Sequence, residues 1–248
     1  MSEAQGASNS HARLKLEAAA ATRLLVHEDI LDYSGHVSVR VPGRDAYLIQ
    51  RGVDPRSDVQ PERMLMVDFD GNVLEGEGRA PIETPIHGEI YRVRPDVNAV
   101  LHCHMELAIA FTLMKDVTLA PMRARAVRWQ SGIPTSPDPS HIKLKEQGET
   151  LARDLGPHQA VLMRAHGLTL VAESVPALLV DAVHFDENAR ALMQVLQAGK
   201  TPVPLTEEEM VQINKHEVRD FHVGKLWAYY TRRGQKAGVL EDAWDFAD

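Results

Sequence analysis

The apolar residues of this 248-residue chain follow two periods, which predict helices and short strands in alternation. The helical period marks residues 13–32, 84–94, 106–113, 145–155 and 175–196, and a last helix from near Thr206 towards Arg233, with a break near Gly224. Short apolar or alternating runs mark strands at 36–41, 46–50, 64–68, 73–74, 98–103, 125–132, 160–163 and 169–171. An Asp70-Gly71 pair joins two of these strands in a hairpin. We therefore predict one α/β domain with a mixed or antiparallel central sheet and helices on both faces.

Composition excludes several classes of protein. The net charge is −8, whereas binding to a nucleic-acid backbone needs an excess of Lys and Arg, so we expect no nucleic-acid partner. No apolar run approaches the ~20 residues of a membrane helix, and the first residues lack the apolar core of a signal peptide, so we expect a cytoplasmic protein without membrane contact. Cys103 is the single cysteine, which excludes an intrachain disulfide. Residues 1–12 are expected to be disordered, and residues 13–248 to form one domain with a helical extension from about residue 200.

Two histidines on one predicted strand form the most informative motif. His102 and His104 are two residues apart, so their side chains lie on the same face of the strand and Cys103 points to the opposite face. Two imidazoles at this spacing can share a divalent ion at ~2.0–2.1 Å. On its own, such a pair is more often two hydrogen-bonded core or surface histidines, so the motif needs further support.

Two other residues supply that support. His166 lies at a turn between two apolar strands, from which its side chain can reach back over the sheet. Glu83 stands just before a predicted helix start, where a carboxylate is ordinarily a solvated cap. Three imidazoles leave a divalent ion an open position for substrate, which is typical of a catalytic metal site. A neighbouring carboxylate could then serve as acid/base or hold the ion when substrate is absent.

The combined pattern resembles the class II aldolase/adducin family. The motifs are ETPIHGEIY at 83–91, RPDVNAVLHCH at 94–104 and RAHG at 164–167, and the resemblance covers roughly residues 13–200. It implies a three-layer α/β/α sandwich with a mostly antiparallel central sheet, assembled as a homo-oligomer, usually a tetramer, with active sites at subunit interfaces. It also implies that His102, His104 and His166 hold one divalent metal ion per chain (zinc, or manganese, cobalt or iron), and that Glu83 is the catalytic acid/base.

The chain departs from the sugar-phosphate members of that family in the loops that hold phosphate. Those members use a Gly-Asn-x-Ser, a Thr-Gly and a Ser-Ser sequence, and this chain has GHVS at 35–38, Arg51-Gly52 and Pro81-Ile82 instead. Ile82 donates no hydrogen bond, and the guanidinium of Arg51 suits a planar carboxylate better than a phosphate. We expect a carboxylate substrate, bound by the loop of Gly35 and Ser38 and clamped by Arg51.

Four further residues are candidate substrate ligands. His36 and His87 match positions that recur in one branch of the family, which contains aromatic-acid decarboxylases such as the 3,4-dihydroxyphthalate decarboxylases. A backbone-bonded loop histidine and a surface helix histidine are the ordinary alternatives for these two. Arg123 and Arg125 fall near the segment where sugar-phosphate aldolases carry a catalytic tyrosine. Either arginine alone is more simply explained as part of a solvated stripe.

By this resemblance, we expect a metal-dependent lyase that decarboxylates a hydroxylated aromatic acid through a metal-stabilised enolate, with Glu83 protonating the ring carbon. An aldolase acting on a non-phosphorylated hydroxy-keto acid would use the same enolate and remains open. A non-haem iron oxygenase on the same three histidines is a further alternative. An adducin-like interaction module is disfavoured, because adducin-type domains have lost the metal ligands that are present here.

Overall fold

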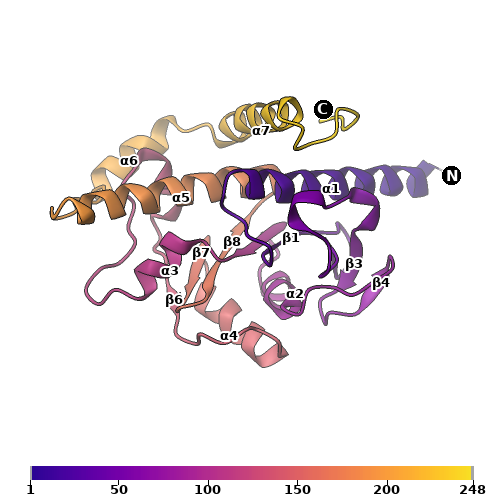
Figure 1. Ribbon diagram of the computed structural model, residues 1–248, viewed down its shortest axis with the longest axis horizontal. Coiled ribbons are helices and arrows are strands. Elements are labelled where there is room, and N and C mark those ends of the chain that lie inside the picture. The colour runs from indigo at the N-terminus through magenta and orange to yellow at the C-terminus, as the bar shows by residue number, and fades with distance from the viewer. Residues whose placement is uncertain (1, 247–248) are drawn as a thin grey trace.

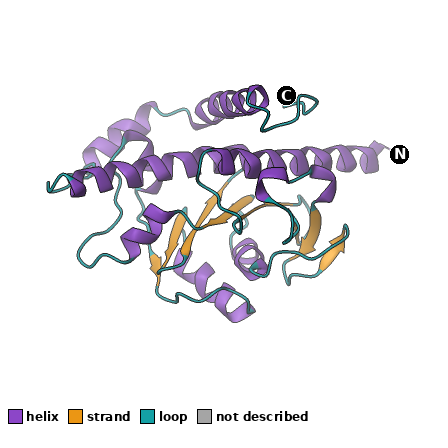
Figure 2. Cartoon of the chain, in the orientation of Figure 1, coloured by secondary structure: helices purple, strands orange, loops and turns teal. Residues whose placement is uncertain are grey.

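The fold is built on one twisted eight-stranded sheet with helices on both faces (Figures 1 and 2). The computed structural model describes the backbone of residues 2–246 and the side chains of residues 11–246. The strands are β1 (His36–Arg40), β2 (Ala46–Ile49), β3 (Leu65–Asp68), β4 (Val73–Glu75), β5 (Ala99–Cys103), β6 (Thr135–Ser136), β7 (Ala160–Met163) and β8 (Gly167–Ala172). Their spatial order is β4-β3-β2-β1-β5-β8-β7-β6, and every neighbouring pair is antiparallel except β6 with β7.

Long helices cover one face of the sheet and short helices the other. Helices α1 (Ser2–His27), α3 (Glu106–Thr112) and α5 (Val175–Gln197) lie on the first face, and α2 (Thr84–Val93) and α4 (Lys145–Leu155) on the second. Helix α7 (Arg219–Lys236) packs outside α1 and α5, and α6 (Glu207–His216) precedes it. The predicted α/β/α sandwich with a mostly antiparallel sheet is therefore confirmed. Within the described residues, no helix combines the length and apolarity that a membrane crossing requires.

The alternation of side chains along each strand divides the core into two apolar layers. Leu48 belongs to the apolar layer that includes α1 and α5, whereas its neighbours Tyr47 and Ile49 belong to the layer that includes α2 and α4. Strand β5 follows the same rule, since Cys103 is fully buried on the α1 side, where burial raises the pKa of its thiol to about 12. His102 consequently lies on the face of α2 and α4, as its spacing from Cys103 predicts.

Two glycines fix the position of helix α2, whose start carries Glu83. A Cβ on Gly88 would lie 2.1 Å from the carbonyl oxygen of Phe69, and one on Gly148 would lie 2.5 Å from that of Pro85. Only glycine allows backbones to approach so closely. Helix α2 is thus held against the end of β3 on one side and against α4 on the other, and this contact sets where Glu83 enters the site.

Three predicted elements differ in the structure. Helix α1 begins at Ser2, so residues 2–12 of the segment expected to be disordered lie in this helix, and residue 1 lies outside the described residues. Residues 125–132 contain no strand. Ala124–Trp129 forms a 3₁₀ helix instead, in which Ala126, Val127 and Trp129 are buried. The C-terminal helix breaks at 217–218 and not at Gly224. Glu217 has an extended backbone (φ −77°, ψ 124°), and Arg125 binds its carboxylate at 2.7 Å.

Candidate metal centre

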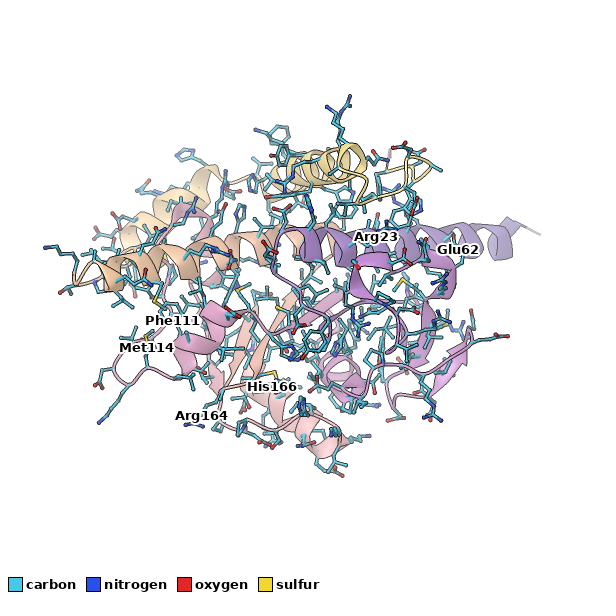
Figure 3. The ribbon with its side chains drawn as sticks, viewed as in Figure 1. Arg23, Glu62, Phe111, Met114, Arg164 and His166 are labelled. Atoms are coloured by element: carbon cyan, nitrogen blue, oxygen red, sulfur yellow. The ribbon has the colours of Figure 1, made fainter. Side chains whose placement is uncertain are left out.

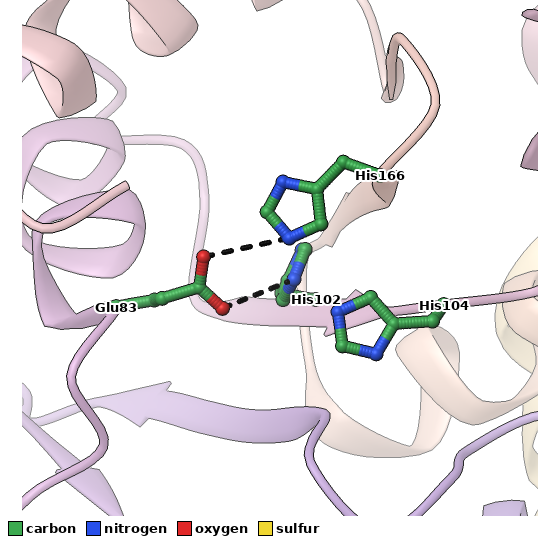
Figure 4. Close-up of side chains that lie close together, drawn as sticks. All are labelled: Glu83, His102, His104 and His166. Carbon is green, nitrogen blue, oxygen red and sulfur yellow. Dashed lines mark ion pairs between the residues drawn. The ribbon is translucent and has the colours of Figure 1, made fainter. Parts of the chain in front are cut away.

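Three histidines meet where the end of β5 lies beside the start of β8. His102 belongs to β5, His104 follows it, and His166 lies in the turn between β7 and β8 (Figure 4). The backbones at this point are very close, because a Cβ on Gly167 would lie 2.5 Å from the carbonyl oxygen of Cys103. The centroids of the three rings are 5.0, 5.1 and 5.4 Å apart. The predicted triad is therefore brought together at one point.

The turn that carries His166 is strained. Ala165 has a φ of 55°, a left-handed conformation that a residue with a Cβ seldom adopts, and its backbone N–H donates to Oγ1 of Thr112 at 3.0 Å. Figure 3 shows His166 and Arg164 together at this turn, far from Arg23 on α1. The strained turn directs the ring of His166 towards β5, where the other two rings lie.

Hydrogen bonds to the Nδ1 atoms determine which nitrogen of each ring faces the centre. Nδ1 of His102 lies 3.1 Å from the carbonyl oxygen of Leu168, and Nδ1 of His166 lies 3.1 Å from that of Ser140. Nδ1 of His104 lies 2.9 Å from Oδ2 of Asp32. These oxygens only accept, so each Nδ1 carries the proton and each Nε2 keeps a free lone pair. This arrangement is typical of histidines that bind metal through Nε2.

Glu83 faces the same centre from the start of α2. Its Oε2 lies 3.5 Å from Nε2 of His102, and its Oε1 lies 3.5 Å from Nε2 of His166 (Figure 4). The backbone N–H of Ile142 donates to Oε1 at 3.1 Å, and Nδ1 of His141 lies 3.5 Å from the same oxygen. One potential ligand atom from each of Glu83 and the three histidines lies within 4.8 Å of all the others.

The residues present fit a divalent cation. Nε2 of His102 and Nε2 of His166 are buried and have no hydrogen-bond partner. Such unpaired buried groups cost ~1–3 kcal/mol each, and a cation bound by their lone pairs removes that cost. Three imidazole nitrogens with one carboxylate suit zinc, and also iron, manganese or cobalt. The candidate metal ligands are therefore His102, His104 and His166, with Glu83 beside them.

The ionisation states agree with that assignment. Burial would raise the pKa of Glu83, but the imidazoles of His102 and His36 outweigh it and hold this pKa below its ordinary range. Burial lowers the pKa of His166 to about 4. At neutral pH the free protein therefore presents a carboxylate and a neutral imidazole, which are the forms that bind a metal ion.

A buried chain of polar groups continues from Glu83 into the core. Nε2 of His36 lies 3.9 Å from Oε2 of Glu83, and its Nδ1 lies 2.7 Å from Nε2 of His87. Oγ of Ser38 then lies 2.6 Å from Nδ1 of His87 and 2.8 Å from the hydroxyl of Tyr91. Burial lowers the pKa of His36 to about 4 and that of His87 well below its ordinary value. Both rings are neutral, and both connect Glu83 to the interior.

A cavity of about 550 Å³ opens beside this centre. Its wall is made of the loops that follow α1, β2 and β4, the end of β5, and the loop before α4. The residues that line it are Tyr33, Ser34, His36, Gly52, Val53, Arg56, Arg79, Ala80, Pro81, Ile82, Glu83, His104, His141 and Lys143. His36 is the one predicted substrate ligand among them. Ser38 and His87 lie behind it in the buried chain.

Gly35 and Arg51, both predicted to bind substrate, are not among the residues that line the cavity. The carbonyl oxygen of Gly35 accepts hydrogen bonds from Arg56 at 2.6 Å and Gln50 at 3.3 Å, so this glycine positions the backbone. The guanidinium of Arg51 binds Asp54 through Nε at 3.0 Å and Nη2 at 2.6 Å. The expected carboxylate clamp is already paired with a carboxylate of its own loop, and Arg51 is absent from the cavity wall.

Arg123 and Arg125 lie away from the candidate metal centre. Arg123 pairs with Glu187 of α5 at 3.3 Å, and Arg125 pairs with Glu217. Their positions follow from the 3₁₀ helix Ala124–Trp129, because a strand there would have placed both side chains on one face. Neither arginine lines the cavity beside the histidines.

Several residues of the site had not been predicted. Asp32 fixes the ring of His104, and His141 and the N–H of Ile142 contact Glu83. Arg79 and Lys143 line the cavity. For Asp32 a local signal existed, because its carboxylate accepts from the N–H groups of Ser34 and Gly35 in a turn that short polar residues favour. The others come from distant loops and leave no local signal.

The fold and the centre together define the class of protein. Residues 17–193 match the family described as Class II Aldolase and Adducin N-terminal domain, and the chain belongs to this family. The membership predicted from the three motifs is thus confirmed.

Relatives in this family include two decarboxylases. The chain is 30% identical over 217 residues to "3,4-dihydroxyphthalate decarboxylase" of Arthrobacter keyseri, covering 82% of this chain and 87% of the relative. It is 29% identical over 212 residues to the protein of the same name in Rhodococcus jostii, covering 80% and 86%. The names of these relatives agree with the expected enzyme class, a carbon–carbon lyase.

Solved structures show the same fold at lower identity. L-fuculose 1-phosphate aldolase from Glaciozyma antarctica superposes with a TM-score of 0.80 at 19% identity, covering 93% of each chain. An aldolase II superfamily protein from Pseudomonas syringae gives a TM-score of 0.78 at 23% identity, covering 92% of this chain and 94% of the other. These likenesses establish the architecture.

Proposed function

We propose that this protein is a metal-dependent decarboxylase of a hydroxylated aromatic acid. The observation that carries the proposal is the position of Glu83, whose carboxylate borders the cavity and lies 3.5 Å from the free Nε2 atoms of two histidines. A proton carrier thus adjoins the place where a substrate oxygen would bind. The relatives named 3,4-dihydroxyphthalate decarboxylase support the substrate class.

A divalent ion held by His102, His104 and His166 would supply a Lewis acid that stabilises negative charge on a substrate oxygen. Glu83 performs the proton transfer. Its low pKa makes it a carboxylate in the free protein, so it begins as the acceptor of the proton of a phenolic hydroxyl. It then delivers this proton to the ring carbon that bears the leaving carboxylate. The ring becomes a ketone, and the carbon–carbon bond can break.

The remaining steps restore the aromatic ring. CO₂ leaves, and the electron pair of the broken bond returns to the ring and its oxygen, which gives a phenolate. The phenolate then takes one proton from water. The N–H of Ile142, 3.1 Å from Oε1 of Glu83, keeps the carboxylate aimed at the centre throughout. Positioned acid/base groups of this kind contribute about 10²–10⁴-fold to a rate.

An aldolase acting on a non-phosphorylated hydroxy-keto acid is the second candidate. The same carboxylate and histidines would accept a hydroxyl proton from such a substrate, and the structural likeness to an aldolase covers 93% of the chain. The cavity disfavours a sugar phosphate, because Ile82 occupies its wall where a phosphate needs donors. For either candidate, the homo-oligomer remains what the family resemblance implies.

The proposal is tested by incubating the metal-loaded protein anaerobically in D₂O with a panel of dihydroxybenzene dicarboxylates. We expect one CO₂ per phenol formed and one deuterium at the carbon that lost the carboxylate, both measured by mass spectrometry. Glu77→Gln, in the neighbouring exposed loop, is the control for Glu83→Gln. Two parallel incubations test the alternatives. Cleavage of added hydroxy-keto acids without CO₂ from any aromatic acid would replace this proposal with the aldolase, and turnover only after oxygen is admitted would replace it with an oxygenase.

A further inference from the structure

We infer that Arg79 and Lys143 form an anion subsite at the mouth of the cavity, which takes the retained carboxylate of a planar dicarboxylic acid. The inference rests on the proposed function, because it names the part of the substrate that the same site holds. It replaces Arg51, which the sequence favoured for this task.

The charge of the cavity wall is opposite to that of the chain. The protein has a net charge of −8, yet the residues that line the cavity include three cations, Arg56, Arg79 and Lys143, against one carboxylate, Glu83. A cleft lined by one sign of charge concentrates ligands of the other sign. The cavity is therefore arranged for an anion, independently of any bound metal ion.

Arg56 contributes charge but its donors are already used. It is 5% exposed, and its Nε donates to the carbonyl oxygen of Gly35 at 2.6 Å. Nη1 donates to the carbonyl oxygen of Asp54, and Nη2 is 3.5 Å from that of Ser34. These bonds hold the loops of the cavity wall in place, so Arg56 has no free pair of N–H donors for a ligand.

Arg79 and Lys143, by contrast, have anchored backbones and free side-chain ends. The carbonyl oxygen of Arg79 accepts from the N–H of Gly52 at 2.9 Å, and the N–H of Lys143 donates to Gln147 at 2.9 Å. Both side chains are exposed, and among the described residues neither has a hydrogen bond or ion pair from its cationic group. Two unpaired cations on loops that flank Glu83 are the donors left for a ligand.

Part of the cavity wall is apolar. Tyr33, Val53 and Ile82 all line the cavity, and they are 87%, 84% and 70% exposed. A flat ring covers such side chains well, and a carboxylate on that ring would reach the cations. A compact polar anion would leave the apolar wall in water, so the shape favours a ring-bearing acid.

The test is equilibrium binding of phthalate, which lacks the hydroxyls needed for turnover, with neutral dimethyl phthalate as the matched probe. Calorimetry is performed on Arg79→Gln, Lys143→Gln and the double variant, each metal-loaded and metal-free. We expect each single variant to weaken phthalate binding about tenfold, a loss of about 1.4 kcal/mol, in both forms. Dimethyl phthalate binding should not change. Arg51→Gln is the control, because that guanidinium is paired with Asp54.

Unchanged phthalate binding by the double variant would overturn the subsite, as would an equal loss in Arg51→Gln. Equal losses for the neutral probe would also overturn it, because they would indicate a structural effect. A different result would show that the proposed function has failed while the subsite stands. Charge-dependent phthalate binding at Arg79 and Lys143 without CO₂ release from any hydroxylated acid would retain the subsite and remove the decarboxylase.

Discussion

The Nδ1 atom of His104 lies 2.9 Å from Oδ2 of Asp32, in the loop between α1 and β1. Burial would raise the pKa of Asp32, but the N–H groups of Ser34 and Gly35 and the ring of His104 outweigh it and keep the carboxyl ionised. Asp32 therefore fixes the protonated nitrogen of His104 and makes the opposite nitrogen a better ligand. The other two rings of the triad depend on backbone carbonyls instead.

Asp32→Asn should weaken metal binding without abolishing it. The amide keeps the shape but removes the charge that raises the basicity of His104, and losses of this kind are about 10–100-fold in affinity. Competition against a chromogenic chelator measures the change. Asp58→Asn, at the exposed end of the 3₁₀ helix Arg56–Asp58, is the control. An affinity equal to that of the unaltered protein would show that Asp32 only shapes its turn.

His104→Ala should remove the metal altogether. We expect about one divalent ion per chain in the purified protein, because three Nε2 lone pairs converge on one point, and two ligands are too few for tight binding. Elemental analysis of the variant should find less than one tenth of that amount, whereas His216→Ala, on the exposed end of α6, should retain it. Stoichiometric metal in the His102→Ala/His104→Ala double variant would contradict the ligand assignment.

Local sequence patterns indicated the candidate metal centre wherever a single strand or turn determines the direction of a side chain. The spacing of His102 and His104 predicted that both side chains lie on one side at the end of β5, and Cys103 is buried on the other side as expected. The turn at His166 followed from two apolar runs that form β7 and β8. These patterns made the three histidines candidates, and the family resemblance implied that they form one ligand set.

The substrate side of the site depends on contacts between loops that no local pattern records. Arg51 was chosen for its guanidinium, yet Asp54, three residues later, occupies it. Arg79 and Lys143 reach the cavity only because the loops before α2 and α4 close on each other, joined by Ile142 and Glu83. Residues 125–132 were predicted as a strand, but Val127 and Trp129 are buried in a 3₁₀ helix instead.

Glu83→Gln should keep the metal and lose turnover. The amide preserves the shape of the side chain and its acceptor for Ile142, but it has no proton to accept and return. We expect kcat to fall about 10²–10⁴-fold with the metal content unchanged, measured on the same preparation. If metal and activity disappear together, Glu83 is chiefly a ligand. If turnover persists, another group moves the proton.

The final prediction concerns His36 and the acid stability of the metal-free protein. Burial lowers the pKa of His36 from 6.5 to about 4, so between these values the unfolded chain binds a proton that the folded chain does not. The contribution of His36 to stability is therefore fully present above pH 6.5 and is lost as the pH falls towards 4. Between pH 7 and pH 5 the loss is about 2 kcal/mol.

Replacing His36 by Asn removes that titration, and the sugar-phosphate relatives carry Asn in the corresponding loop. Urea unfolding of the chelated protein at pH 7 and pH 5 measures the effect, in a range where carboxyl groups contribute little. We expect the unaltered protein to lose about 2 kcal/mol more than His36→Asn over this interval. Between pH 7 and pH 8.5 the two proteins should change in parallel, which is the internal control. Equal losses between pH 7 and pH 5 would mean that His36 accepts a proton in the folded state, and that its bond to His87 does not keep it neutral.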